Sequence, residues 1–458
     1  MSFDQSRRAF LRRSAALGIA GVATPLVSSL AAIGEAAAAT ASDYKALVCI
    51  FLYGGNDYAN TLTPYDTTSH AAYAAARPTF AYARDSLAAT LLRPNNDMGG
   101  RQYALAPALA PLLPLFDSGA MAPVLNVGTL IQPTTKAQYL AKSVPVPPRL
   151  FSHNDQQSFF QASAPEGASS GWGGRIGDLL QSGNGAAALT CINASGNAVY
   201  LSGRSAVQCV VGTSGPVALL GGSNSMFGSS AAVSTLRSLM TAPQQHLFAS
   251  EYAGLSKRAL DTSTQVNAAL ASAPASNFPL FPAKNPLADQ LKMVARMMSV
   301  SGALGLKRQV FFVSLGGFDT HDALGSAHAK QLALLSAAMK AFHDTTVAMN
   351  MSQNVTSFTA SDFGRTLTSN GDGTDHGWGG MHFVMGGAVR GKRIYGAAPI
   401  VGSDTPDDVG QGRLLPTISV DQYAATLSRW FGVGAGDMAT VLPNVGNYNA
   451  SSLDLGFV

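Results

Sequence analysis

Four strand-like stretches, three of them almost unbroken apolar runs, place the strongest constraint on how this chain folds. They are residues Lys45–Tyr53, Ala122–Val127, Gln309–Leu315 and Asn354–Ala360. Glycine or a short polar turn follows each run, and a continuous apolar run bounded in this way is typical of a strand that is covered on both faces. Strands of that kind occur in parallel sheets with helices on either side, so the runs predict four buried strands.

Helical patterns separate these predicted strands. Apolar residues recur at three- and four-residue spacing in Leu287–Val300 and His328–Met349, and a helix-like stretch, Ser419–Phe431, lies near the end of the chain. Strands that alternate with helices predict an α/β fold with a doubly wound, mostly parallel sheet. Residues 203–286 are rich in Ala, Ser and polar residues, and we interpret them as a helical insertion over the sheet edge or as a flexible surface excursion.

The low charge of the chain excludes some classes of partner. Charged residues make up 12% of the 458 residues, and part of the formal net charge of +4 lies in the N-terminal stretch. That balance leaves no basic surface of the kind that binds nucleic acid. Beyond the N-terminal stretch, no apolar run reaches about 18 residues, the length of a membrane-spanning helix. We therefore expect neither a nucleic-acid partner nor a stable membrane span.

The N-terminus resembles an export signal. An arginine pair, Arg7-Arg8, precedes an apolar segment, and small residues stand at Ala37–Ala39. This pattern describes a secretory signal, and the arginine pair resembles a twin-arginine signal specifically. We expect residues 1–39 to be a twin-arginine signal peptide read by the translocation machinery, and residues 40–458 to be a single periplasmic or secreted domain. The alternative is an amphipathic first helix with a chance arginine pair.

The three cysteines form no metal-binding or redox motif. None stands in a C-x-x-C pair, and Cys49 lies within an apolar run, where a cysteine behaves as a small buried hydrophobic residue. Cys191 and Cys209 could be bridged in an oxidising compartment, or both could be free thiols.

An aspartate follows three of the four predicted strands. These residues are Asp57, Asp319 and Asp362. In doubly wound sheets, ligands bind beyond the carboxyl ends of the strands. One aspartate in that place is usually a turn or a helix cap. Three of them, two followed closely by histidine or arginine, predict a shared site.

Histidines occur in segments of the same kind. Three of the eight stand in glycine-rich, aspartate-containing segments and a fourth lies in a polar stretch; they are His321, His376, His382 and His153. Aspartate and histidine without paired cysteines suit a divalent cation such as Zn, Mn, Mg or Ca. We expect one or two ions, and two ions about 4 Å apart would clamp a tetrahedral ester. The alternative is a structural role for each histidine.

Six segments resemble the bacterial family called domain of unknown function 1501. They are Leu52–Tyr65, Gly171–Arg175, Gly317–His321, Ser361–Thr366, Gly373–Gly377 and Pro416–Ala425, so the resemblance spans about residues 45–435. Members of that family usually carry a twin-arginine signal. The family is similar to the alkaline phosphatase and sulfatase superfamily, which implies an alkaline-phosphatase-like, doubly wound sheet with a two-metal site.

The resemblance also implies roles for particular residues. It places Asp57 as the first metal carboxylate, Ser152 near the nucleophile, the other ligands at Asp319, His321, Asp362 and His376, and substitutes at Asp375 and His382. Phe363 stands where the superfamily has a further histidine, which implies a single ion, altered ligands or an inactive site. Thr61 is an alternative nucleophile. His153 and Arg365 would stabilise charge on a substrate, although Arg365 could instead hold its loop through a salt bridge.

These features predict an exported, metal-dependent hydrolase of phosphate or sulfate esters that acts on a small anionic ester. In that hypothesis, loss of Asp57 or Asp362 abolishes turnover and leaves the fold intact. The alternative is a non-catalytic periplasmic binding or scaffold protein that keeps the phosphatase-like fold. A redox protein is disfavoured, because the chain has no C-x-x-C-H motif and no dinucleotide-binding glycine pattern after the first strand.

Overall fold

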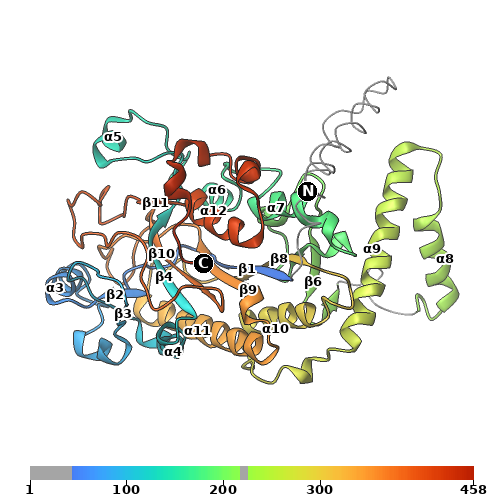
Figure 1. Ribbon diagram of the computed structural model, residues 1–458, viewed down its shortest axis with the longest axis horizontal. Coiled ribbons are helices and arrows are strands. Elements are labelled where there is room, and N and C mark those ends of the chain that lie inside the picture. The colour runs from blue at the N-terminus through green and yellow to red at the C-terminus, as the bar shows by residue number, and fades with distance from the viewer. Residues whose placement is uncertain (1–43, 217–224) are drawn as a thin grey trace, which may run out of the picture.

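A nine-stranded sheet lies at the centre of the protein in the computed structural model, which describes residues 44–216 and 225–458 (Figure 1). Its strands are β1 (Lys45–Leu52), β4 (Met121–Gly128), β5 (Cys191–Asn193), β6 (Cys209–Gly212), β7 (Gly215–Pro216), β8 (Arg308–Leu315), β9 (Val355–Ser361), β10 (Gly380–Gly386) and β11 (Ile418–Ser419). They lie in the order β11-β4-β10-β9-β1-β8-β5-β6-β7. A separate antiparallel pair joins β2 (Leu62–Pro64) to β3 (Tyr103–Leu105).

The sheet is mostly parallel, as the sequence predicts. β1 pairs in parallel with β8 on one side and β9 on the other, and β5 continues the parallel arrangement beyond β8. Only two strands of the described sheet run the other way: β10 is antiparallel to both β4 and β9, and β7 is antiparallel to β6. The carboxyl ends of β1, β8 and β9 therefore meet at one edge of the sheet, and the loops that follow them are neighbours.

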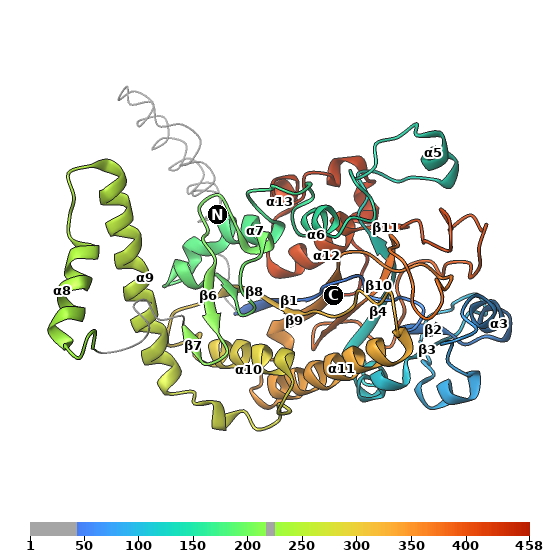
Figure 2. The same ribbon diagram turned by 180° about the vertical axis from the view of Figure 1, so that it is seen from behind.

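Helices cover both faces of the sheet (Figures 1 and 2). Their bounds are α3 (Thr67–Ala76), α4 (Leu113–Asp117), α5 (Lys136–Ala141), α6 (His153–Ala162), α7 (Trp172–Leu180), α8 (Ser230–Thr241), α9 (Leu247–Ala271), α10 (Pro286–Ser299), α11 (Leu324–Ala348), α12 (Val420–Phe431) and α13 (Met438–Val441). α10 and α11 lie on one face, and α7, α12 and α13 lie on the other. Among the described residues, no helix combines the length and the apolar character needed to cross a membrane.

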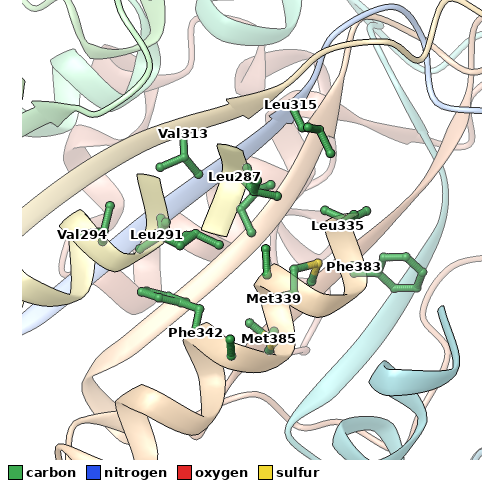
Figure 3. Close-up of a cluster of buried hydrophobic side chains, with 14 of the residues drawn as sticks. Leu287, Leu291, Val294, Val313, Leu315, Leu335, Met339, Phe342, Phe383 and Met385 are labelled. Atoms are coloured by element: carbon green, nitrogen blue, oxygen red, sulfur yellow. The ribbon is translucent and has the colours of Figure 1, made fainter. Parts of the chain in front are cut away.

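Alternate residues of β1 enter two different cores. Val48 and Ile50 pack in the cluster that contains the apolar faces of α10 and α11, whereas Leu47 and Phe51 pack in the cluster that contains α7 and α12. Figure 3 shows the first core, where side chains such as Leu291 from α10 lie against the strands. Each fully buried side chain of this size contributes about 1.5–3 kcal/mol. The two cores together thus stabilise the central strands of the sheet.

The structure confirms the four predicted strands, which correspond to β1, β4, β8 and β9, and the three predicted helices, which correspond to α10, α11 and α12. The sequence analysis missed β10, because this strand, Gly380–Gly386, begins and ends in glycine and contains a histidine. It lies between β4 and β9, where its residues are all buried. The predicted signal peptide, residues 1–39, lies outside the described residues.

The segment 203–286 contributes strands as well as helices. β6 and β7 extend the sheet at one end, and α8 and α9 follow as a helical hairpin that projects from the body of the protein (Figures 1 and 2). The C-terminal part of α9 contacts β7, and α8 packs on α9. The described part of this segment is therefore a helical insertion at the sheet edge that also completes the sheet.

Cys191 and Cys209 do not form the disulfide that the sequence left open. Cys191 lies in β5 and Cys209 in β6, and both thiols are free. The register pairs Ile192, not Cys191, with Cys209. Successive side chains of a strand point to opposite faces of the sheet, so Cys191 enters the core beneath α7 whereas Cys209 packs against the core on the other face.

Candidate functional site

The candidate site lies at the sheet edge where β1, β8 and β9 end. Its loops are closely packed: a Cβ on Gly54, whose φ is +114°, would stand 2.3 Å from the backbone nitrogen of Asp319. Only glycine fits such a position, because its backbone is left-handed and the neighbouring loop leaves no space for a side chain. The glycine pair after β1 thus lets the loop after β8 approach, and it brings Asp319 toward the end of β9.

Two histidines and one aspartate form the centre of the site. One ligand atom from each of His153, Asp319 and His376 lies within 4.8 Å of the other two, the geometry of a possible metal site. The Nε2 of His153 is 3.4 Å from Asp319 Oδ2, and the Nε2 of His376 is 3.3 Å from Asp319 Oδ1. Neighbouring ligands of a tetrahedral ion with bonds of about 2.0–2.1 Å lie about 3.3–3.4 Å apart. The distances therefore suit coordination of one ion.

Hydrogen bonds fix the orientation of both rings. The Nδ1 of His153 lies 2.6 Å from Asp362 Oδ2, and the Nδ1 of His376 lies 2.7 Å from the carbonyl oxygen of Phe151. A carboxylate and a carbonyl accept hydrogen bonds, so each Nδ1 carries the proton and each Nε2 offers its lone pair to the centre. Metal-binding histidines are commonly held in this way. Phe151 itself has a φ of +73°, an unusual value for a bulky residue that aims its carbonyl at His376.

The polar atoms at the centre support a role in binding. The Nε2 of His153 is buried and has no hydrogen-bond partner among the described residues. An unpartnered buried polar atom is costly unless something binds it. The hydrogen bond with Asp362 raises the pKa of His153 in spite of its burial, whereas burial lowers the pKa of His376 and favours the neutral ring that a ligand requires. The residues present thus fit a divalent cation.

His321 lies beside this centre. Its Nε2 is 2.9 Å from the Nε2 of His376 and 3.0 Å from Asp319 Oδ1. Its Nδ1 lies 3.4 Å from Asp375 Oδ1. Asp375 thus lies beside the ring nitrogen of His321 that is turned away from Asp319, and the group of His153, Asp319 and His376 does not include His321. Within residues 44–216 and 225–458 the ligand-type side chains form one such group, with no second group beside it.

Arg365 holds Asp319 in place. Its Nη1 donates to Asp319 Oδ1 at 2.6 Å and to the carbonyl oxygen of Gly54 at 3.1 Å, and its Nη2 donates to the carbonyl oxygen of Thr374. Burial opposes ionisation of Asp319, but the hydrogen bond and the charge of Arg365 outweigh it and lower the pKa of Asp319. The guanidinium is fully buried. Of the two roles considered for Arg365, the structure shows the salt bridge.

Asp57 has a different partner from the one the sequence suggested. Both of its oxygens accept from Arg77, at 2.7 Å and 2.8 Å, and its Oδ1 also accepts from the backbone nitrogen of Asn60. The two charged side chains are fully buried. Burial alone would raise the pKa of Asp57, but Arg77 outweighs it and lowers the pKa. Asp57 thus fixes the loop after β1 and lies outside the group of His153, Asp319 and His376, which we call the histidine group.

Two functional residues escaped the sequence analysis. The Arg77 guanidinium also donates hydrogen bonds to Asn60 Oδ1, Thr366 O and Leu367 O, so each of its nitrogen atoms has a partner. No motif around Arg77 in the sequence singled it out. Gln157 donates to Asp362 Oδ2 at 2.8 Å and so shares that oxygen with His153. The i,i+4 spacing of His153 and Gln157 on α6 was the signal that could have found it.

The remaining candidate residues lie at the margin of the site or away from it. Ser152 precedes α6 and its hydroxyl donates to Asp155 Oδ2 at 2.9 Å, while its chain neighbours on both sides contact the centre. Thr61 is buried and its hydroxyl donates to the carbonyl oxygen of Asp57. His382 lies in β10 and stacks on Tyr423, where burial lowers its pKa to about 3. His382 is therefore a core residue.

Comparison with known proteins places this fold in a family. A family model described as a protein of unknown function, DUF1501, matches residues 44–441. No curated protein matches the chain. The match covers nearly all of the described chain, including every residue of the histidine group, and the chain belongs to the DUF1501 family.

Proposed function

We propose that the protein is an exported, metal-dependent hydrolase of phosphate or sulfate esters with an alkaline-phosphatase-like fold. One observation carries the proposal: His153, Asp319 and His376 converge, and the Nε2 of His153 is buried without a hydrogen-bond partner among the described residues. The location at the carboxyl ends of parallel strands is where ligands of such sheets bind. His153, Asp319, His376 and His321 would hold one divalent cation, Zn, Mn, Mg or Ca.

Different side chains of the protein would have different roles at this site. A divalent cation would supply positive charge to a tetrahedral ester and lower the pKa of a bound nucleophile. Asp362 and Gln157 keep His153 in the correct tautomer, and Arg365 keeps Asp319 ionised and in position. Ser152 is the nucleophile in this proposal, since Asp155 is placed to accept its proton.

In the reaction, the Ser152 oxygen forms a bond to phosphorus or sulfur while the bond to the ester oxygen breaks, and the leaving alcohol takes up a proton. Water then releases the phosphate or sulfate and restores the hydroxyl. Microscopic reversibility requires the group that accepts a proton in one step to return it in the other. Asp155, which accepts the hydrogen bond of the Ser152 hydroxyl, would take up that proton and return it.

A second candidate function is a non-catalytic binding or scaffold protein, and one observation favours it. Phe363 stands beside the histidine group, with its ring 4.9 Å from the His153 ring and 4.7 Å from the His376 ring, measured between centroids. An apolar ring there packs the histidines and supplies no ligand for a second ion. A protein that binds one ion and a partner, without catalysis, would not need a second ion.

Metal analysis tests the proposal most directly. The protein is exported by its own signal and purified without chelator, beside His376→Ala and the control His246→Ala, which changes an exposed histidine of the helical hairpin. We expect about one equivalent of a divalent metal in the wild type and in the control, and a large loss in His376→Ala. Phosphate and sulfate esters are then screened with and without chelator.

These measurements distinguish the hydrolase from the binding protein. Turnover that disappears with chelator and in Ser152→Ala supports the hydrolase. Bound metal without turnover on either ester class supports the binding protein. Equal metal content in the wild type and His376→Ala would contradict the site itself.

Export is tested separately. Arg7 and Arg8 lie outside the described residues, and a twin-arginine signal depends on the pair. Replacing both with lysine should retain the protein in the cytoplasm. Unchanged export of that variant would show that another route is used.

A further inference from the structure

One stripe of apolar side chains on α9 is covered in one half of the helix and uncovered in the other. Val266 and Leu270, in the C-terminal half, are 0% and 4% exposed and belong to the core. Phe248, Tyr252 and Leu255, in the N-terminal half, are 77%, 62% and 51% exposed. Their spacings of three, four and eleven residues, the last about three full turns, place all of these side chains on the same side of the helix.

The uncovered half lies in the projecting hairpin. Figures 1 and 2 show α8 and the N-terminal half of α9 standing clear of the sheet and of its other helices. α8 covers another side of α9, where Ala253 and Ser256 are buried. Leu239 of α8 is also a large apolar side chain with 67% exposure. Adjacent large apolar side chains of this kind mark an interaction surface.

We propose that this stripe is the interface with a second copy of the same chain, in which the two α9 helices pack antiparallel about a two-fold axis. Symmetric pairing through one self-complementary surface is the commonest form of oligomer. Two hairpins that pack in this way form a four-helix bundle, in which Tyr252 of each copy lies near Leu255 of the other. The apolar stripe then becomes the centre of that bundle.

The charges beside the stripe support this arrangement. Glu251 and Arg258 are both exposed and lie on the same flank of the stripe, because they are seven residues apart. Neither forms an ion pair among the described residues. A two-fold axis that reverses the helix direction brings the same flanks together, so Glu251 of one copy meets Arg258 of the other, and this contact occurs twice. A parallel pairing about a two-fold axis would bring opposite flanks together, so this contact between Glu251 and Arg258 would not form.

Lys257, on the far side of α9, provides a control for the experiment that follows. Lys257 forms an ion pair with Asp261 within its own chain at 2.7 Å, and both side chains are exposed. The position of Lys257 is about 180° from the centre of the stripe, given 3.6 residues per turn. Lys257→Glu therefore changes the net charge as much as the interface variants do and leaves the proposed interface untouched.

Charge reversal tests the proposal. The molecular mass of the purified full chain is measured by sedimentation from about 1 to about 100 µM, the range in which a modest interface dissociates. We expect a dimer for the wild type and for Lys257→Glu. Glu251→Arg and Arg258→Glu should each weaken the dimer by about tenfold or more, and the double variant should regain it, because the pairs are then restored in the opposite sense.

The other outcomes overturn the proposal. A wild type that is monomeric throughout, or single variants that dimerise as well as the wild type, would exclude this interface. If the monomeric wild type binds vesicles of phosphatidylglycerol and phosphatidylethanolamine and Leu255→Glu abolishes that binding, the stripe faces a lipid surface instead. Thermal unfolding of each variant confirms that the charge reversals leave the fold intact.

Discussion

Replacement of Asp57 by Asn separates the role that the sequence suggests from the role that the structure shows. As a metal ligand, Asp57 would be dispensable for folding and essential for metal binding. In the structure its two oxygens are bound to Arg77, and both side chains have 0% exposure. Asparagine keeps the shape of the side chain, but it removes the negative charge and turns an amide N–H toward the guanidinium. Arg77 is then a buried cation without a counter-charge.

The expected cost follows from that geometry. Removal of one partner of a buried ion pair costs about 3–5 kcal/mol, because the remaining charge is stranded in the interior. Total unfolding free energies of protein domains are about 5–15 kcal/mol. Asp57→Asn should therefore lose a large share of the stability of the protein. The histidine group, which does not include Asp57, should still bind metal in the molecules that remain folded.

A double-mutant cycle isolates the pair. Arg77→Met alone leaves a buried carboxylate, and it should also destabilise the protein by about 3–5 kcal/mol. The double variant leaves no unpaired charge, so its loss should be smaller than the sum of the two single losses by about 1–3 kcal/mol. Guanidinium unfolding followed by tryptophan fluorescence gives these free energies. The metal content of each folded variant is measured on the same samples.

Two results would refute this reasoning. If Asp57→Asn keeps the stability of the wild type to within about 0.5 kcal/mol and loses its metal, Asp57 is a ligand. If the losses of the single variants simply add, the ion pair is not the source of the stability.

Three further predictions follow from the buried groups. Asp362→Asn should raise the metal dissociation constant by about 10- to 100-fold without unfolding the protein, because Asp362 orients His153; an unchanged constant by competition with a chromophoric chelator would exclude that role. Burial lowers the pKa of His328 to about 4, so the unfolded chain takes up a proton first and His328 should account for about 3 kcal/mol of the fall in unfolding free energy between about pH 6.5 and pH 4; the fall should be smaller by that amount in His328→Gln, and an equal fall would contradict this. Cys191 and Cys209 lie on opposite faces of the sheet, so thiol titration of the denatured, unreduced protein should find all three thiols of the chain.

Much of the architecture was predictable from the sequence, and the reason is physical. A strand covered on both faces is mostly apolar, so Gln309–Leu315 could be recognised without knowledge of its neighbours. The residues that follow such strands must lie at the carboxyl edge of a parallel sheet. The sequence therefore also predicted that Asp319, His321 and Asp362 lie near one another, and the structure brings all three to the histidine group or its immediate support.

The role of each candidate residue depended on side-chain directions and distant partners. Asp57 and Asp319 both follow a parallel strand, yet Asp57 turns toward Arg77 while Asp319 turns toward the histidines. Asp362 has the position expected of a ligand, but it holds His153 from behind. No spacing in the chain predicts these choices, because the partner that decides each one comes from a different loop.

The sequence by itself determined the α/β fold, its main strands and helices, and the edge of the sheet at which polar groups collect. These properties follow from local patterns of apolar residues, which act over a few turns or one strand. The tertiary structure alone decided which carboxylate faces the histidines, which carboxylate is neutralised by Arg77, and which half of α9 is left uncovered. Those outcomes depend on packing between segments that are far apart in the chain, and so they exist only once the chain has folded.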